Sequence, residues 1–138
     1  MTFGQTWYPT FVPDVFPGVA NFNTGIMFNP FGWAGQIKVA QKLSSDLTLS
    51  VVAYKDREFQ TANATGASTN SATFNSSMPT FHGQLQYKKK NITAGIGAEY
   101  QSLKPVIESG GLVSDETVNS GMYFGYFKYA NEKIITKF

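Results

Sequence analysis

The sequence predicts an all-β fold, an antiparallel meander of strands that belongs to a transmembrane β-barrel. Several runs of about ten residues alternate between apolar and polar side chains, which is the period of a β-strand. The connections between these runs alternate between short polar turns and long variable loops. Charged residues make up only 14% of the 138-residue chain, against about 25% in soluble domains, while aromatic residues reach 15%. No stretch approaches the roughly 18 apolar residues of a membrane helix.

Residues 2–8 are short and strand-like, and they lead into a Pro- and Phe-rich segment, residues 9–33. Prolines and glycines interrupt this segment so often that neither a helix nor a strand can run through it. Leaving its aromatic side chains in water would cost roughly 25 cal/mol per Å² of apolar surface. We therefore expect the segment to fold inward, against the inner wall of a barrel or a neighbouring subunit. The residues expected to form such a constriction are Phe11, Asp14, Phe16, Phe22, Phe28 and Phe31.

The next two strands are expected over residues 34–42 and 47–59, joined by a short turn at residues 44–46. On the first strand, Ile37 and Val39 share the apolar face, and Lys38 lies on the opposite face. The second strand continues the pattern, with aliphatic residues on one face and polar residues on the other. Residues 61–78, which are dominated by Thr, Ala, Asn, Ser and Gly, then form a polar loop.

The hairpin of residues 80–101 carries the clearest alternation, because two strands of about ten residues meet at a tight polar turn. Its strands are long enough for tilted membrane crossing, and aromatic residues lie toward the ends of their apolar faces. The apolar face is Phe81, Gly83, Leu85, Tyr87, Ile92, Ala94, Ile96, Ala98 and Tyr100. The opposite face is His82, Gln84, Gln86, Lys88, Thr93, Gly95, Gly97, Glu99 and Gln101.

A second long connection covers residues 103–117, followed by a strand at 118–129, a turn at 130–133 and a short run at 134–138. Short turns thus centre near residues 45, 91 and 131, and long loops separate them. This order is typical of outer-membrane barrels, which have short periplasmic turns and long outer loops. A soluble sandwich or lipocalin-like barrel is the alternative. Its inner face would need bulky apolar residues, whereas the polar face here suits an aqueous wall.

We accordingly expect the polar face to line a pore. The residues predicted to line it are Lys38, Lys42, Asp56, Arg57, Glu58, His82, Gln84, Gln86, Lys88, Glu99 and Gln101. Selectivity for small polar or anionic solutes would come from the lysines and arginine, balanced by the carboxylates. A formal net charge of +2 without a basic block gives no reason to expect nucleic-acid binding.

Residues suited to catalysis or to cofactor binding are sparse. The chain has no cysteine, so it has neither a disulfide nor a thiolate metal site. The carboxylates lack calcium-loop spacing, and Gly95-Ile96-Gly97 lacks the context of a phosphate-binding loop. His82 is the single histidine, and no serine or orienting acid is tied to it by sequence spacing. We predict no catalytic residue, metal or cofactor, and treat an outer-membrane hydrolase using His82 as the less favoured alternative.

The front of the chain resembles a known family. Gly4-Gln5-Thr6-Trp7, the loop with Asp14-Val15-Phe16-Pro17 and Phe22-Asn23-Thr24-Gly25, and the strand opening Gln36-Ile37-Lys38-Val39 are similar to DcaP-like porins of Gram-negative bacteria. Lys38 replaces the arginine of that pattern, which keeps the charge but loses the bidentate fork. The resemblance covers residues 4–42. It implies a large outer-membrane barrel, often a trimer, that carries small and frequently anionic solutes.

The expected function is an outer-membrane porin-type channel, whose expected partners are membrane lipid, small polar solutes, and further copies of the chain or other outer-membrane proteins. A structural or interaction subunit without transport is the alternative. We expect residues 1–138 to form a single barrel domain or part of one, since about six confident strands do not close even the smallest eight-stranded barrel. A part of a larger porin is favoured over a minimal barrel plugged by the Pro-rich segment.

Overall fold

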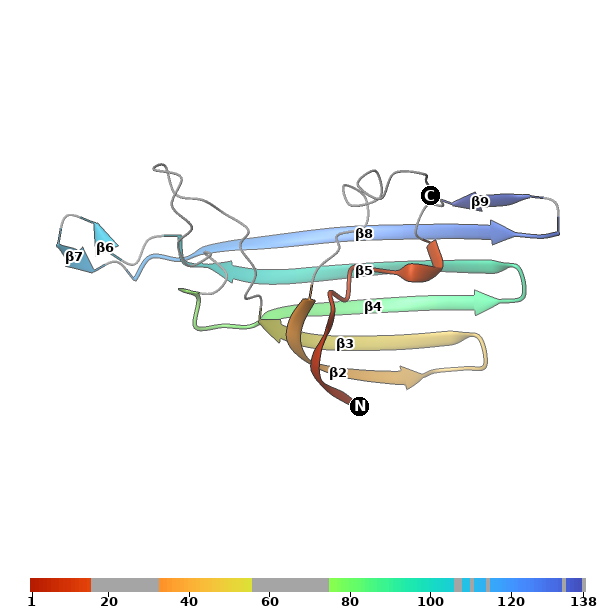
Figure 1. The fold of residues 1–138 in the computed structure, drawn as a ribbon, viewed down its shortest axis with the longest axis horizontal. Coiled ribbons are helices and arrows are strands. Elements are labelled where there is room, and N and C mark those ends of the chain that lie inside the picture. The colour runs from red at the N-terminus through yellow and green to blue at the C-terminus, as the bar shows by residue number, and fades with distance from the viewer. Residues whose placement is uncertain are drawn as a thin grey trace.

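The chain forms an all-β, antiparallel meander with almost no helix (Figure 1). The computed structural model describes residues 1–15, 33–55, 75–105, 108–109, 111–113, 115–132 and 134–137. Seven strands form one sheet in the order β1-β2-β3-β4-β5-β8-β9, and β6-β7 form a small separate ribbon. The strands of the main sheet are β1 (Thr2–Trp7), β2 (Trp33–Lys42), β3 (Leu47–Lys55), β4 (Thr80–Lys89), β5 (Ile92–Leu103), β8 (Val118–Ala130) and β9 (Ile135–Lys137). The ribbon is β6 (Glu108–Ser109) and β7 (Leu112–Val113), and a 3-10 turn, η1, covers Pro13–Val15.

Each strand pairs with its sequence neighbours in the sheet, and the pairing register decides which side chains share a face. His82 of β4 stands opposite Glu99 of β5, which in turn stands opposite Met122 of β8. Because side chains alternate along a strand, this one row fixes the faces of the whole sheet. Most polar residues of β2, β4 and β5 therefore fall on one face and most apolar residues on the other, with Gln41 and Ser102 as polar residues of the apolar face.

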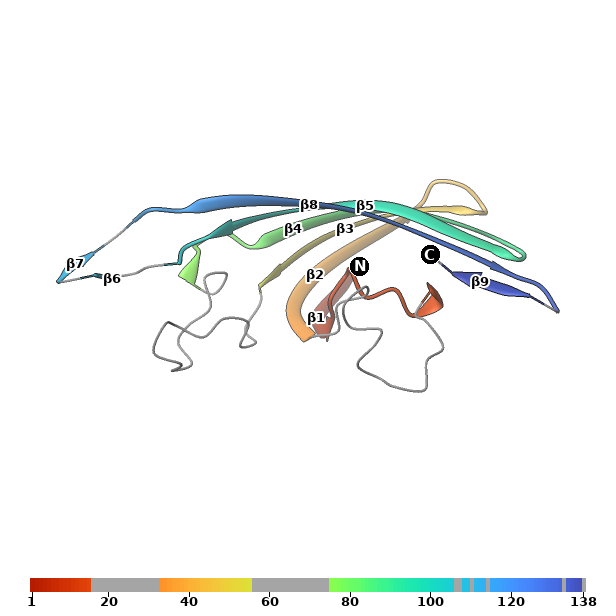
Figure 2. The ribbon, with the colours of Figure 1, turned by 90° about the horizontal axis from the view of Figure 1, so that it is seen from above.

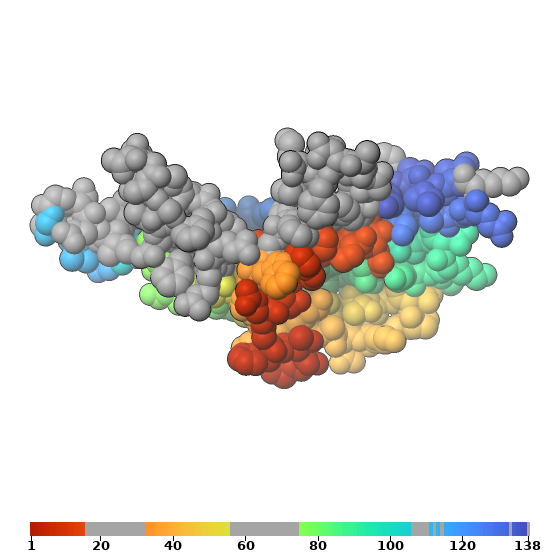
Figure 3. All heavy atoms as spheres, in the orientation of Figure 1, coloured from red at the N-terminus to blue at the C-terminus, as the bar shows by residue number. Residues whose placement is uncertain are grey.

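The sheet is strongly curved, and β1, η1 and β9 lie on its concave side (Figure 2). The polar face is the concave one, since Asp14 of η1 accepts a hydrogen bond from Lys88. A small apolar cluster at the loop end of this face joins the segment after β1 to β2 and β3. It consists of the buried residues Tyr8, Ala34, Val52 and Tyr54. Figure 3 shows β1 and η1 in front of the strands that they cover.

The convex face has the opposite character. Many of its large apolar side chains are exposed, including Ile96 at 66% and Tyr123 at 86%. Among the described convex residues of β2–β5 and β8, only Lys55 and Lys89 are charged, and both lie near the ends of their strands. Its exposed large apolar residues are Phe3, Trp7, Trp33, Ile37, Val39, Leu49, Val51, Phe81, Tyr87, Ile92, Ile96, Tyr100, Tyr123 and Phe127.

Several expectations from the sequence are refined by the structure. The first irregular segment contains η1, and the second long connection contains the β6-β7 ribbon, neither of which was expected. Strand β5 extends to Leu103, two residues beyond the predicted end. The strand predicted over residues 47–59 is described only as far as Lys55, because residues 56–74 lie outside the described chain. In the second long connection, residues 103–117, Lys104 donates a hydrogen bond to Asp115 at 2.9 Å. This hydrogen bond and the positive charge of Lys104 lower the pKa of the Asp115 carboxyl.

The seven described strands form an open sheet. Within the described part of the chain, β1 pairs only with β2 and β9 pairs only with β8. The antiparallel meander is therefore established, and closure into a barrel stays a prediction. In the described segments, no helix has the length and apolar character that a membrane-crossing helix requires.

Candidate functional site on the concave face

The centre of the concave face is a buried pair of titratable side chains. Nδ1 of His82 lies 3.3 Å from Oε2 of Glu99 on the neighbouring strand. The His82 side chain is fully buried and that of Glu99 is 9% exposed. The pair exists because the β4-β5 register places these two residues directly opposite each other. A carboxylate at this distance orients the imidazole ring.

The pair continues into a polar network that crosses three strands. Nε2 of His82 lies 3.3 Å from Oε1 of Gln84. The amide nitrogens of Gln84 and Gln86 donate to the hydroxyl of Tyr126, at 2.6 and 2.9 Å. Hence one chain of contacts joins β5 to β4 and then to β8. We call Glu99, His82, Gln84, Gln86 and Tyr126 the polar network.

The buried hydrogen-bonding groups of the polar network are all paired. Every buried side-chain nitrogen and oxygen in the described part of the chain has a hydrogen-bond partner. Such complete pairing is required for polar groups removed from water.

Two glycines of β5 create the space for this network. Tyr126 stands opposite Gly95, and Phe124 stands opposite Gly97. A Cβ at position 95 would overlap the Tyr126 ring, with Cε1 at 2.7 Å, and a Cβ at position 97 would overlap the Phe124 ring and lie 3.0 Å from the Gly83 carbonyl oxygen. Both rings therefore lie across β5 and reach the side chains of β4. Phe124 also stacks on His82, with ring centroids 5.4 Å apart.

The segment after β1 is held against the concave face at both ends, near the turns by an ion pair and near the loops by apolar contacts. Lys88 donates to Asp14 of η1 at 2.7 Å, although both side chains are largely exposed. Val12 is buried, and the ring of Tyr8 lies 5.7 Å from that of Tyr54. Thus residues 8–15 lie against the inner surface of the curved sheet. Whether the rest of the Pro- and Phe-rich segment folds inward stays a prediction, because residues 16–32 lie outside the described chain.

The predicted pore-lining residues fall into three groups. His82, Gln84, Gln86 and Glu99 are brought together in the polar network. Lys38, Lys42, Lys88 and Gln101 share the concave face by register, with Lys38 in the same cross-strand row as His82. Asp56, Arg57 and Glu58, like the predicted constriction residues Phe16, Phe22, Phe28 and Phe31, lie outside the described residues. Of the constriction set, Phe11 and Asp14 are described, and the Phe11 ring lies 5.4 Å from that of Trp7.

The concave face carries more cations than anions. Two lysines that the sequence reasoning did not single out, Lys128 and Lys137, pair across β8 and β9. They stand in one row with Thr93 and Lys88. The described charged residues of this face, other than His82, are Lys38, Lys42, Lys88, Lys128, Lys137, Asp14 and Glu99. Among the described residues, this wall therefore carries a net positive charge.

The described site contains part of the arrangement of a hydrolase triad. Glu99 supplies the orienting acid for His82 that spacing alone did not assign. However, Nε2 of His82 faces the amide of Gln84, and no serine or threonine hydroxyl contacts the ring within the described segments. An acid-histidine pair without a nucleophile lacks the arrangement of a hydrolase triad. Within the described residues, no three potential metal ligands among His, Cys, Asp and Glu lie together.

The parts of the site that sequence reasoning missed did leave a signal. The two-residue turn Lys90-Asn91 fixes the β4-β5 register, and counting back from it places His82 opposite Glu99. Likewise, Gly-x-Gly on one strand and Phe-x-Tyr on another are complementary patterns of missing and large side chains. The glycines were tested only against phosphate-loop motifs, although in a strand a glycine indicates close approach by a neighbouring group.

Comparisons with known proteins give no assignment. Neither the family models, nor the curated protein sequences, nor the solved structures contain a significant match to this chain.

Proposed function

We propose that this chain forms part of the wall of a transmembrane β-barrel in a bacterial outer membrane. We propose further that the barrel acts as a porin-type channel for small polar or anionic solutes. The observation that carries the proposal is the distribution of side chains over the curved sheet. The convex face is mostly apolar, with its described charges only near the strand ends. The concave face holds the polar network and most of the described charges, beside apolar residues of β8 such as Met122 and Phe124. A soluble sheet buries its apolar face, but a membrane barrel turns that face outward toward lipid.

The lengths and ends of the strands support the same proposal. Strands β4, β5 and β8 have 10, 12 and 13 residues, against about 9–11 for a tilted transmembrane strand. On the convex face, Phe81 and Tyr100 stand in one cross-strand row and Tyr87 and Phe127 stand in another, with Leu85 and Ile96 between the two rows. Tyr123 of β8 lies inside this band. Along β4, for example, Phe81 and Tyr87 are separated by about 20 Å at a rise of roughly 3.3 Å per residue. Aromatic girdles on either side of an apolar band about 25 Å tall are characteristic of outer-membrane barrels.

The barrel itself is tested by a denaturing gel of the native, detergent-extracted protein, run with and without boiling. We expect the unboiled protein to migrate differently, because a closed barrel keeps its fold in the detergent until it is heated. The same migration before and after boiling, together with extraction into buffer without detergent, would contradict the barrel. The convex face would then have to be covered by protein.

Transport is tested by ion selectivity in planar bilayers. Five described lysines of the concave face stand with two carboxylates, and replacing Lys38 and Lys42 by glutamate would leave three lysines with four carboxylates. We therefore expect the reversal potential of the double variant to move from anion toward cation selectivity. Lys104→Glu, outside the main sheet, is the matched control and should leave it unchanged. An unaltered reversal potential in the double variant would contradict the proposal that Lys38 and Lys42 line the pore.

The open sheet favours a second candidate, a structural or interaction subunit without transport. The sheet has seven antiparallel strands, so its two outermost strands, β1 and β9, run in the same direction. An all-antiparallel barrel built on it needs an odd number of additional strands, from other residues of the chain or from a partner. A stable partner protein combined with no single-channel conductance would favour this candidate over the channel.

A further inference from the structure

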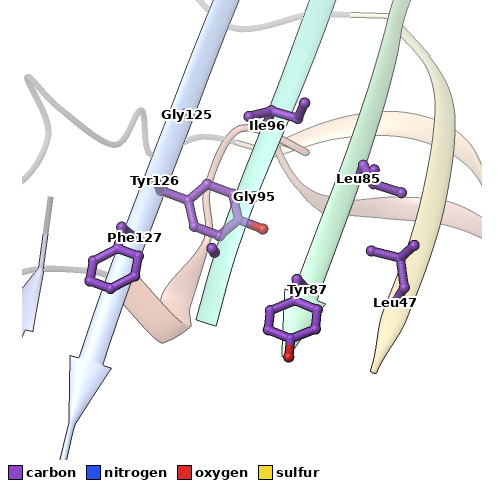
Figure 4. Close-up of a pocket in the computed structure, with 9 residues that line it drawn as sticks. Leu47, Leu85, Tyr87, Gly95, Ile96, Gly125, Tyr126 and Phe127 are labelled. Carbon is purple, nitrogen blue, oxygen red and sulfur yellow. The ribbon is translucent and has the colours of Figure 1, made fainter. Parts of the chain in front are cut away.

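The convex face has an apolar groove near its turn end. The groove has a volume of about 440 Å³ and lies over β3, β4, β5 and β8. Figure 4 shows the rings of Tyr87 on β4 and Phe127 on β8, on either side of β5, at one end of it, with Leu85 and Ile96 further along. It exists because Ala94 and Gly125, between these large side chains, are small. We propose that this groove binds one acyl chain of an anionic phospholipid, a proposal that rests on the proposed membrane location.

The end of the groove supplies the charge that such a lipid would need. Lys89 follows Tyr87 by two residues, which is about 7 Å along the strand. Its side chain is 57% exposed although it lies 3.5 Å from Asp46. Lys90 follows at the turn, with a positive φ of 47°, and makes no ion pair with any described residue. The Tyr87 hydroxyl points toward the same end (Figure 4), as expected for an aromatic residue at the headgroup level.

The chemistry of the groove favours a lipid over a protein segment. Strands β4 and β5 are internal strands of the sheet, so their backbone hydrogen-bonding groups are already paired with neighbours. A bound peptide could not add a strand there, and its own backbone groups would lose their water without replacement. A hydrocarbon chain has no such groups. The groove therefore fits an uncharged chain that ends in a phosphate near the lysines.

The lipid site is tested by native mass spectrometry of the detergent-extracted protein titrated with phosphatidylglycerol or with phosphatidylcholine of the same acyl chains. We expect one phosphatidylglycerol to be retained in preference to phosphatidylcholine. In the double variant Lys89→Gln, Lys90→Asn, affinity for phosphatidylglycerol should fall roughly 30-fold, about fivefold for each lysine. Asparagine is chosen at position 90 because it tolerates a positive φ.

A second variant tests the acyl chain independently of the headgroup. Gly125→Val fills the groove, and a Cβ there would meet only ordinary contacts, at 3.6 Å from the Gly95 oxygen and 3.9 Å from Ile96. We expect it to lose the lipid, whereas Gly83→Val should keep it. Gly83 lies on the same face, outside the groove, and a Cβ there meets no atom within 4 Å.

The outcomes separate the lipid site from the barrel. Retention by Gly125→Val, or equal retention by the lysine variant and the wild type, would overturn the lipid site. Wild-type protein that binds glycerol phosphate as tightly as phosphatidylglycerol would overturn it too, because the acyl chain would then contribute nothing. If the denaturing gel still shows a migration shift on boiling when the lipid site is overturned in one of these ways, the proposed barrel stands. If that shift is absent as well, both proposals fail.

Discussion

Gly95→Ala is expected to destabilise the protein by about 3 to 5 kcal/mol. The added methyl group would overlap the Tyr126 ring, and forcing one extra carbon into a packed site costs roughly 1 to 3 kcal/mol. When the ring moves, its hydroxyl would also leave the amides of Gln84 and Gln86, at about 1 kcal/mol for each hydrogen bond. The free energy of unfolding is measured in detergent by denaturant titration, followed through the fluorescence of Trp7 and Trp33.

The matched control reverses the sign of the effect. Gly83→Ala places a methyl group on the neighbouring strand where no atom lies within 4 Å. There the loss of glycine's conformational freedom in the unfolded chain should stabilise the protein by about 0.4 to 1 kcal/mol. Combining Gly95→Ala with Tyr126→Ala removes the overlap, so the double variant should lose less than the sum of the two single variants. Equal stability of Gly95→Ala and Gly83→Ala would mean that Tyr126 does not need the space over β5.

The local elements were predictable because each depends on a short stretch of sequence. The alternation of residues 80–101 and the polar turn at their centre determine a hairpin, a register and two faces. The concave position of Lys38, His82 and Glu99 follows from these local rules. The β6-β7 ribbon was missed because its strands have only two residues each, too few for any period to be detected.

The long-range features were harder to predict because they depend on residues far apart in the chain. The Lys88-Asp14 bond joins positions 74 residues apart, and nothing in the local pattern of either residue indicates the other. Tyr126 likewise reaches Gln84 across β5, over 42 residues of sequence. Sheet closure belongs to the same class. It depends on which strand meets the edges of β1 and β9, and alternation within a strand carries no information about that.

Arginine substitutions along the convex face of β5 should reveal whether this face lies in a bilayer. Ile96 is 66% exposed and lies four residues from both Ile92 and Tyr100 on the same face. In lipid, Ile96→Arg should cost about 2 to 4 kcal/mol, the range for a cationic side chain at the midplane of a barrel. In water, the same substitution at so exposed a position should change stability by no more than about 0.5 kcal/mol.

The profile along the strand is more informative than the single value. We expect Ile92→Arg and Tyr100→Arg to cost about 0 to 1 kcal/mol, since an arginine near an interface reaches the headgroups. Ala40→Arg, at an exposed position of the concave face, is the control and should be close to neutral. Unfolding by guanidinium in liposomes gives all four values. A maximum at Ile96 is the result that a bilayer predicts, because only a bilayer makes the cost depend on depth. Similar large losses at all three positions would instead indicate a protein partner packed over this face, and small losses throughout would place the face in water.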